Sequence, residues 1–372
     1  MKRLLAAIAA TASAVALAQG VSDSEIVLGQ SAPLSGPAEQ LGKDMQQGAA
    51  LYFNQVNAHG GINGRRIVLK TLDDGYDPPR AAENTRKLID QERAFALFGY
   101  VGTPTSQASL PIFTEAKVPF VGAFTGAELL RSPFNRYVFN VRASYFDETE
   151  AIVQHLTAMS INKIAVFYQN DAYGQAGLAG VERALKKRSL EVASKATFER
   201  NTVNVKQAVD TMAKAQPQAV IMVGAYKACA AFIRDMKKSL ATPTFWNVSF
   251  VGSKALAKEL GPEGRGVQIS QVVPFPWDNA IPVVRDYRKA IDEAKGEPGF
   301  GTLEGYIAAR VTAEGLRRAG KALTREGFIK AMESMADYDV GGFKVSFGPQ
   351  EHNNASKFVD LTIISRDEKF VR

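Results

Sequence analysis

Residues 99–106, which read GYVGTPTS, follow directly on the apolar run at 94–98. A glycine-rich turn with three hydroxyls, placed between a strand and a helix, presents hydroxyl and backbone N–H donors at a helix N-terminus. It lacks the lysine of a nucleotide-binding loop, and the Gly-Lys pairs at 42–43 and 320–321 are followed by neither serine nor threonine. The turn therefore predicts the capture of a small polar or anionic ligand.

The common catalytic motifs are missing from the chain. It contains neither a GxSxG nucleophile elbow nor an HExxH zinc motif. Its histidines, His59, His155 and His352, are scattered, with no second ligand at metal spacing. Residues 299–305 (GFGTLEG) are one residue too long for a dinucleotide fingerprint and do not follow a strand. We therefore expect no enzyme activity, no cofactor and no metal site.

The N-terminus has the pattern of a secretory signal peptide. After Lys2 and Arg3, residues 4–18 form an uncharged apolar stretch that ends in Ala-Leu-Ala, which predicts cleavage before Gln19. The stretch is too short and too weakly apolar for a stable membrane span. Cys229, the single cysteine, excludes an internal disulfide and leaves none for lipid attachment after the cleavage point. We expect the mature protein in the periplasm.

The net charge does not indicate a nucleic-acid partner. The formal charge is +7, and loss of Lys2 and Arg3 leaves +5. The densest basic groups, at 186–188 and 237–238, fall at the ends of predicted helices, where cations complement the helix dipole. No interleaved aromatic residues and no nucleic-acid motif accompany them.

Short apolar strands alternate with amphipathic helices in two successive runs. The chain has 372 residues, 46% of them hydrophobic, which suits two lobes better than a single core. In the first run, strands are predicted at 26–28, 67–72, 95–98 and 118–121, and helices at 40–58, at 80–90 and through 113. In the second, strands are predicted at 163–168, 190–197, 219–223, 244–247 and 267–269, and helices at 173–187, at 203–215, through 234, at 281–294 and at 302–319. This rhythm predicts an α/β protein with two doubly wound parallel sheets, joined near 141–147 and 271–277.

Polar and glycine-rich turns follow several of these strands. In the first unit they lie at 99–106 and 122–126, and in the second at 170–174, 224–226 and 248–249. In open parallel sheets, ligands bind beyond the carboxyl ends of the strands. The turns therefore predict the two walls of a binding cleft.

Four motifs, in this order, resemble those of the periplasmic binding proteins of branched-chain amino acid ABC importers. They are the run from Gly36 through NQVNAHGGINGRRI, the DDGYDP motif at 73–78, the hydroxyl loop after Phe98, and YGQAGLAG at 173–180. The resemblance covers nearly all of the mature chain. It implies a monomer of type I periplasmic binding fold, whose two Rossmann-like lobes close on a small-molecule ligand and deliver it to an ABC permease in the inner membrane.

The resemblance also implies a third crossing between the lobes, near 336–345. The first lobe is then expected at 22–141 plus 277–338, and the second at 146–271 plus 343–372. The final strands, at 343–347 and 358–364, are expected to return to the second lobe.

In this family, a hydroxyl at the Thr103 position and the turn after the following strand hold the ligand's carboxylate and ammonium. Thr125 is the natural candidate in that turn if a one-residue gap is allowed, whereas Gly126 aligns without one. Helix capping is the alternative role for Thr103. The ligand-binding residues implied in this way are Gly102, Thr103, Ala123, Phe124, Thr125, Gly126, Tyr173, Tyr226 and Ser249. Tyr100, Tyr145, Asp171 and Glu304 are secondary candidates, and core packing is the alternative for the tyrosines.

Ser249 departs from the family pattern, because amino-acid binders place an acidic residue there to pair with the ligand's ammonium. An unpaired buried charge is costly. Either Asp171 or Glu304 replaces the missing acid, or the ligand carries no ammonium. Three functions remain open: an importer's binding protein, a sensor that presents its ligand to a membrane receptor, and a secreted α/β enzyme, which the missing catalytic motifs disfavour.

Overall fold

The structure, a computed structural model, describes residues 19–239, 243–351 and 354–372. The predicted signal peptide at 1–18 lies outside the described residues. Within the described ranges, none of the helices combines the length and the apolarity that crossing a bilayer requires.

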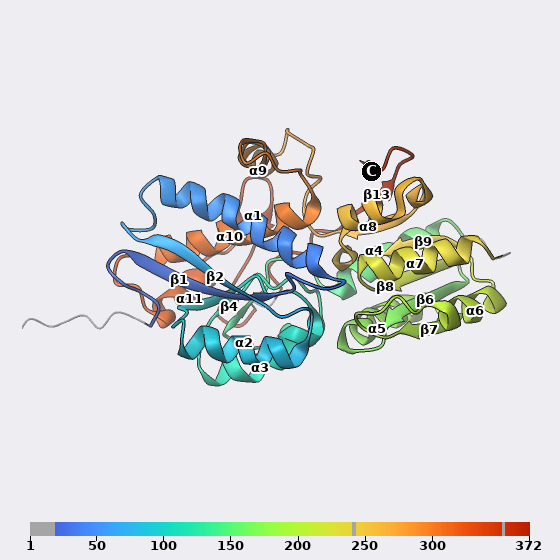
Figure 1. Ribbon diagram of the computed structural model, residues 1–372, viewed down its shortest axis with the longest axis horizontal. Helices are drawn as coiled ribbons and strands as arrows, with labels where there is room; N and C mark the ends of the chain where they lie inside the picture. The colour runs from blue at the N-terminus through green and yellow to red at the C-terminus, as the bar shows by residue number, and fades with distance from the viewer. Residues whose placement is uncertain (1–18, 240–242, 352–353) are drawn as a thin grey trace, which may run out of the picture.

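The first lobe is built on a parallel five-stranded sheet in the order β2-β1-β3-β4-β5. Its strands are β1 (Glu25–Ala32), β2 (Arg66–Asp73), β3 (Ala96–Phe98), β4 (Phe120–Val121) and β5 (Val138–Phe139). Its helices are α1 (Glu39–Ala58), α2 (Pro78–Asp90), α3 (Thr103–Glu115), α9 (Pro282–Glu293), α10 (Phe300–Ala319) and α11 (Arg325–Glu333). Helices α1 and α10 pack together on one face of the sheet, and α2 and α3 pack together on the other (Figure 1).

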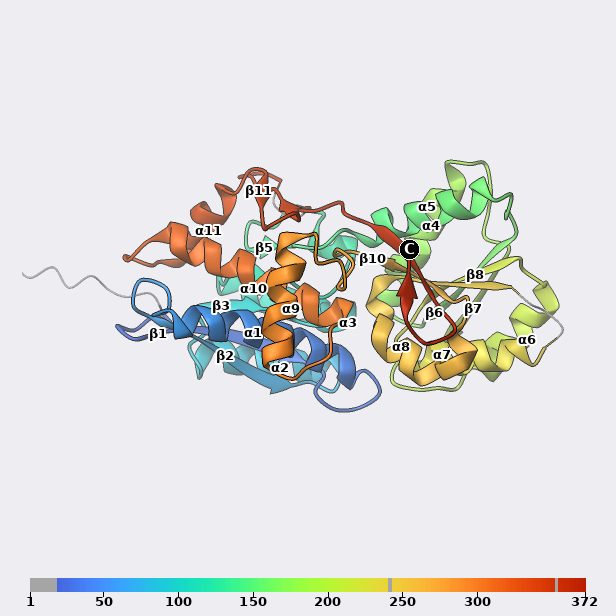
Figure 2. The same ribbon diagram turned by 90° about the horizontal axis from the view of Figure 1, so that it is seen from above.

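The second lobe is built on a seven-stranded sheet in the order β14-β13-β10-β9-β8-β6-β7. Its parallel strands are β6 (Ile164–Gln169), β7 (Ser194–Phe198), β8 (Ala219–Val223), β9 (Thr244–Asn247) and β10 (Gln268–Gln271). The antiparallel strands β13 (Asp360–Ile364) and β14 (Phe370–Val371) extend the edge beside β10. Its helices are α4 (Tyr145–Ala158), α5 (Ala172–Lys186), α6 (Lys206–Ala215), α7 (Tyr226–Lys237) and α8 (Ser253–Leu260). Helices α4 and α5 cover one face, and α6, α7 and α8 the other (Figure 2).

Local sequence accounts for these elements. The central strands β6 and β8 are apolar runs buried on both faces, as parallel sheets require. Asp77 caps α2 by accepting a hydrogen bond of 3.0 Å from the backbone N–H of Arg80. Ser144 and Asp147 form a reciprocal capping box at the start of α4. The alternation of strands and helices predicted from the sequence is confirmed.

One strand prediction is wrong. The segment 343–347 does not return to the second lobe, because β12 (Lys344–Val345) pairs antiparallel with β11 (Tyr338–Asp339) in a separate two-stranded ribbon. Gly341 and Gly342, both at positive φ, turn the chain back between the two strands. The N–H of Phe347 then donates to the carbonyl of Met335 at 2.9 Å, beside the first lobe.

The chain passes between the lobes three times: after β5, after β10 and after β12. The lobes nevertheless touch away from these connections. Asn201 Nδ2 of the second lobe donates to the carbonyl of Gly75 at 3.1 Å, and Lys254 Nζ lies 2.5 Å from Glu297 Oε2. The cleft between the sheets is therefore in a closed arrangement.

Candidate ligand-binding cleft

The turn after β3 directs a buried hydroxyl toward the connection between the lobes. Gly102, at φ +105°, precedes α3, and no side-chain hydrogen bond caps this helix. Thr103 Oγ1 lies instead 2.7 Å from Thr125 Oγ1, and Thr125 Oγ1 donates to the phenol oxygen of Tyr145 at 3.3 Å. These side chains are fully buried. The hydroxyl of Thr103 therefore joins a hydroxyl chain and does not cap the helix.

Tyr76 lies over this turn and is positioned by the DDGYDP motif. The buried carboxylate of Asp74 accepts from Ser31 Oγ at 2.7 Å and from the backbone N–H of Tyr76 at 2.9 Å. Burial raises the pKa of Asp74 to about 6. A Cβ at Gly102 would come within 2.3 Å of the Tyr76 ring, so glycine is what allows the ring to lie there. Gln169 Nε2, from the second lobe, donates to the Tyr76 phenol at 3.4 Å.

Five aromatic side chains from both lobes fill the cleft. This aromatic cluster consists of Tyr76, Phe124, Tyr145, Tyr173 and Phe250, none of them more than 3% exposed. Phe250 is central: its ring centroid lies 4.5 Å from that of Tyr173, 5.6 Å from that of Phe124 and 6.0 Å from that of Tyr76. The rings of Tyr145 and Tyr173 are 5.5 Å apart. In this arrangement, a ligand can enter the cleft only if these rings move apart.

A buried cation connects the two lobes beside the aromatic cluster. Arg142, on the connection between β5 and α4, is 1% exposed. Its Nη2 lies 3.3 Å from Glu148 Oε1 on α4, and its Nη1 lies 3.5 Å from Glu304 Oε1 on α10. Its guanidinium carbon also lies 4.9 Å from the centroid of the Phe124 ring, in a cation–π contact.

Ser249 bonds to this ion pair. Its backbone N–H donates to Glu148 Oε2 at 2.7 Å, its hydroxyl donates to Glu148 Oε1 at 3.0 Å, and Arg142 Nη2 donates to the same hydroxyl. Ser270 Oγ donates to Glu148 Oε2 at 2.6 Å. The structure thus gives Ser249 the role of a partner to buried charges at the connection, where the sequence indicated only a place facing the ligand.

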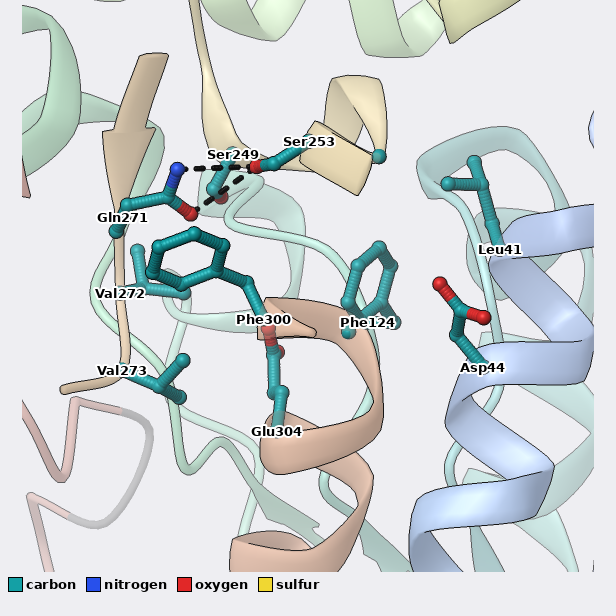
Figure 3. A pocket seen from close by; sticks show the side chains of 12 residues that line it. Leu41, Asp44, Phe124, Ser249, Ser253, Gln271, Val272, Val273, Phe300 and Glu304 are labelled. Atoms are coloured by element: carbon teal, nitrogen blue, oxygen red, sulfur yellow. Dashed lines mark hydrogen bonds between the residues drawn. The ribbon is translucent and has the colours of Figure 1, made fainter. Parts of the chain in front are cut away.

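Glu304 borders a small cavity at the edge of the aromatic cluster. The cavity, of about 10 Å³, is lined among others by Phe124, Asp44 and Phe300 (Figure 3). That is room for about one water molecule. Burial raises the pKa of Glu304 to about 7 against the lowering effect of Arg142, and burial raises the pKa of Asp44 to about 6.

Three buried polar atoms at the cleft have no hydrogen-bond partner among the described residues. They are the phenol oxygen of Tyr173 and the Nε and Nη1 atoms of Arg142, of which Nη1 has only the 3.5 Å ion pair with Glu304. Buried polar groups in folded proteins are usually paired. Unpaired groups at the edge of a cleft are therefore candidates for ligand contacts.

Several predicted residues lie elsewhere. Tyr100 and Ala123 pack in the core of the first lobe, where the phenol of Tyr100 lies 3.1 Å from Thr85 Oγ1. Tyr226 lines a groove of about 700 Å³ between α1 of the first lobe and α8 of the second, which shares Asp44 with the small cavity, but its ring lies outside the aromatic cluster. Gly126 supplies a carbonyl that accepts from the N–H of Tyr145 at 2.7 Å.

Asp171 is occupied by structural contacts. Its carboxylate caps α5 by accepting from the N–H of Tyr173 at 2.9 Å, and it also accepts from Gln169 Nε2 at 2.6 Å. Arg200 Nη1 lies 3.1 Å from Asp171 Oδ2, the oxygen that also accepts from Gln169. Of the two acids proposed to replace a missing partner for an ammonium, Glu304 therefore has the greater free capacity.

Sequence reasoning missed Tyr76, Arg142, Glu148 and Phe250 as residues of the cleft. A signal existed for two of them. Tyr76 stands within the DDGYDP motif, and Phe250 follows Ser249 directly at the carboxyl end of β9. Arg142 stands in the predicted connection at 141–147, but nothing in the sequence places it between two glutamates distant in the chain.

Two α/β lobes whose carboxyl strand ends face each other across a cleft define the class of bilobal binding proteins. In the described residues, no group of three or more His, Cys, Asp or Glu side chains could hold a metal ion. Residues 25–364 match the family model described as "Periplasmic binding protein". The chain belongs to this family, which is one of binding proteins and not of enzymes.

Solved structures agree with this assignment. The chain is 36% identical to a possible leucine/isoleucine/valine-binding protein from Rhodopirellula baltica SH 1, with a TM-score of 0.89 over 94% of this chain and 97% of that one. It is 32% identical to a substrate-binding periplasmic protein from Ralstonia solanacearum, with a TM-score of 0.88 over 93% and 99% of the two chains. Among curated relatives, it is 23% identical to the leucine-, isoleucine-, valine-, threonine- and alanine-binding protein of Pseudomonas aeruginosa PAO1, over 86% of each chain.

Proposed function

We propose that this protein is the extracytoplasmic substrate-binding protein of an ABC importer. It captures an amino acid or a related small organic acid between its lobes and delivers it to a membrane permease. The observation that carries the proposal is the pairing, across one cleft, of the hydroxyl turn at Thr103 with the rings of Tyr173 and Phe250. The name of the Pseudomonas relative, an amino-acid-binding protein, supports the same class of ligand.

The proposed ligand site combines residues of both lobes. Gly102, Thr103 and Thr125 supply the polar wall at the N-terminus of α3, where backbone N–H groups favour an anion. Phe124, Tyr145 and Tyr173 supply apolar surface. Residues 1–18 serve as the leader that directs the chain to the periplasm. The three connections act as the hinge on which the lobes open and close.

Mass spectrometry of small molecules released from the natively purified protein by denaturation tests this function. A single organic acid or amino acid released at close to one per chain is the expected result. Transport assays with the purified protein and candidate ABC permeases from the same genome then test delivery. Uptake that does not depend on the protein would point instead to a sensor.

A further inference from the structure

Each carboxylate that the structure describes beside the aromatic cluster already has a partner. Glu148 is saturated by Arg142, Ser249 and Ser270. Asp171 is occupied as a helix cap and by Arg200. Glu304 forms an ion pair with Arg142 Nη1 at 3.5 Å, and Asp44, which lines the small cavity with Phe124, accepts from Gln40 Nε2 at 2.6 Å. An ammonium among these rings would have to displace one of these partners, and it would lie close to the positive charge of Arg142, which contacts the Phe124 ring.

The cleft groups that have no hydrogen-bond partner among the described residues are donors, and one of them, Arg142 Nη1, has only the 3.5 Å ion pair with Glu304. Arg142 Nε and Nη1 can only donate hydrogen bonds, and the phenol of Tyr173 can donate one. Arg142 and Tyr173 are both buried on the edge of the aromatic cluster. The hydroxyl chain from Thr103 through Thr125 to Tyr145 offers further donors on the opposite wall. This set of groups complements an acceptor with several lone pairs, such as a carboxylate.

We propose that the cleft selects a carboxylate that has an aromatic or branched aliphatic body and no ammonium group, with Tyr173 and Arg142 as its donors and Phe250 against its body. This inference rests on the proposed function and names its ligand class. Phe250 sets the selection, since it fills the centre of the cleft with apolar surface and leaves no place for a charged group. An amino acid would bury its ammonium against that ring and could reach an acid only by breaking a contact that the acid already makes.

The test uses pairs of probes that differ only in the ammonium group, added to full-length protein that has been unfolded and refolded to remove bound ligand. The pairs are 3-phenylpropanoate with phenylalanine, and 4-methylpentanoate with leucine. We expect at least one of the acids to raise the melting temperature. In calorimetry, that acid should bind at least about tenfold more tightly than its amino acid, because moving the ammonium out of water costs the amino acid binding free energy. Equal or tighter binding of the amino acids, or no binding of either acid, overturns the inference.

Tyr173→Phe separates ligand contact from structure. Because the Tyr173 phenol has no hydrogen-bond partner among the described residues, its removal should leave the melting temperature unchanged while weakening the binding of the acid by about tenfold. Tyr100→Phe is the matched control, since that phenol is bonded in the core of the first lobe; it should lower the melting temperature and leave binding intact. Loss of stability without loss of affinity in Tyr173→Phe would contradict the proposed contact.

Phe250→Glu tests the selection directly, because a carboxylate at that point should favour phenylalanine over 3-phenylpropanoate. If this variant does not fold, Phe250→Leu serves instead, because it keeps the site apolar. It should weaken the binding of 3-phenylpropanoate and still exclude phenylalanine. A Phe250→Leu variant that gains phenylalanine binding overturns the inference. The proposed function stands if an amino acid is preferred, whereas conversion of a probe into a product would overturn the function itself.

Discussion

Arg142 Nη1 lies 3.5 Å from Glu304 Oε1, and the two residues come from the first connection between the lobes and from α10. The same guanidinium reaches Glu148 on α4 through its other terminal nitrogen. One side chain thus holds an acid of each lobe, so opening the cleft exposes at least one of these ion pairs to water.

Glu304 makes the stability of the closed form depend on pH. Its pKa rises from 4.5 to about 7 because burial disfavours its charge. The folded chain then binds more protons than the unfolded chain between these values, so the free energy of unfolding falls as the pH rises from 4.5 to 7. A shift of this size corresponds to a loss on the order of 3 kcal/mol. Asp44 lines the same cavity and acts in the same direction.

Glu304→Gln isolates this effect. We expect the variant to lose less stability than the wild type between pH 5 and pH 8, as measured by urea unfolding at several pH values. If the free energy of unfolding changes with pH to the same extent in both proteins, the ionisation of Glu304 does not destabilise the fold and the prediction is wrong. The saturated Glu148 serves for comparison, because Glu148→Gln leaves Arg142 short of its best-bonded partner and should destabilise at every pH in this range.

Thr103→Ala should weaken ligand binding by about 1–3 kcal/mol, because a charged ligand oxygen in a desolvated site loses one donor. The helix start should be little affected, since the Thr103 hydroxyl bonds Thr125 and does not cap α3. Calorimetry with the ligand identified by mass spectrometry checks the first effect, and the melting temperature checks the second. Thr103→Ser keeps the hydroxyl and is expected to retain affinity. Normal affinity in Thr103→Ala would remove Thr103 from the ligand site.

Gly102→Ala should disturb both stability and binding. The residue has φ +105°, and the added methyl group would lie 2.3 Å from the Tyr76 ring. We expect a loss of about 1–3 kcal/mol in unfolding free energy from backbone strain, together with displaced Tyr76 and weaker binding. Gly64→Ala is the matched control: it has φ +85° but no neighbour within 4 Å, so it should show the backbone cost alone. Equal effects of the two substitutions on binding would exclude a role for Tyr76.

The lobes are expected to move as units. Away from the connections, Asn201 and Gly75, together with Lys254 and Glu297, hold the closed arrangement through exposed contacts, which contribute little in water. Small-angle scattering should therefore show a larger radius of gyration for the stripped protein than for the liganded one. An identical radius, with ligand shown to be bound, would contradict hinge closure.

The sequence sufficed for most of the fold because periodicity and capping are local properties. The helix at 39–58 and the buried strand at 219–223 follow from patterns within single segments. The ribbon of β11 and β12 did not follow, since 343–347 is as apolar as a strand of the large sheet, and only the turn at Gly341 and Gly342 decides its partner. Pairing between segments is set by tertiary contacts that no short pattern records.

The candidate site was easier to predict on the wall formed by the first lobe than on the wall formed by the second. The turns of Thr103 and Thr125 were identified by their positions at strand ends, and the family resemblance singled out these two hydroxyls, which the structure places 2.7 Å apart. The role of Ser249 depended on Arg142 and Glu148, which lie about a hundred residues earlier in the chain. A buried ion pair formed across such a distance cannot be read from residue spacing.

The side chains of the aromatic cluster occupy the space that a ligand needs in the cleft. Every ring contact that Phe250 makes with Tyr173, Phe124 and Tyr76 must be exchanged for a contact with the ligand. The affinity that an experiment measures is therefore the difference between two occupied states, the rings packed on one another and the rings packed on the ligand. A molecule that merely fits gains little, and discrimination among similar ligands depends on how completely each one replaces the contacts it breaks.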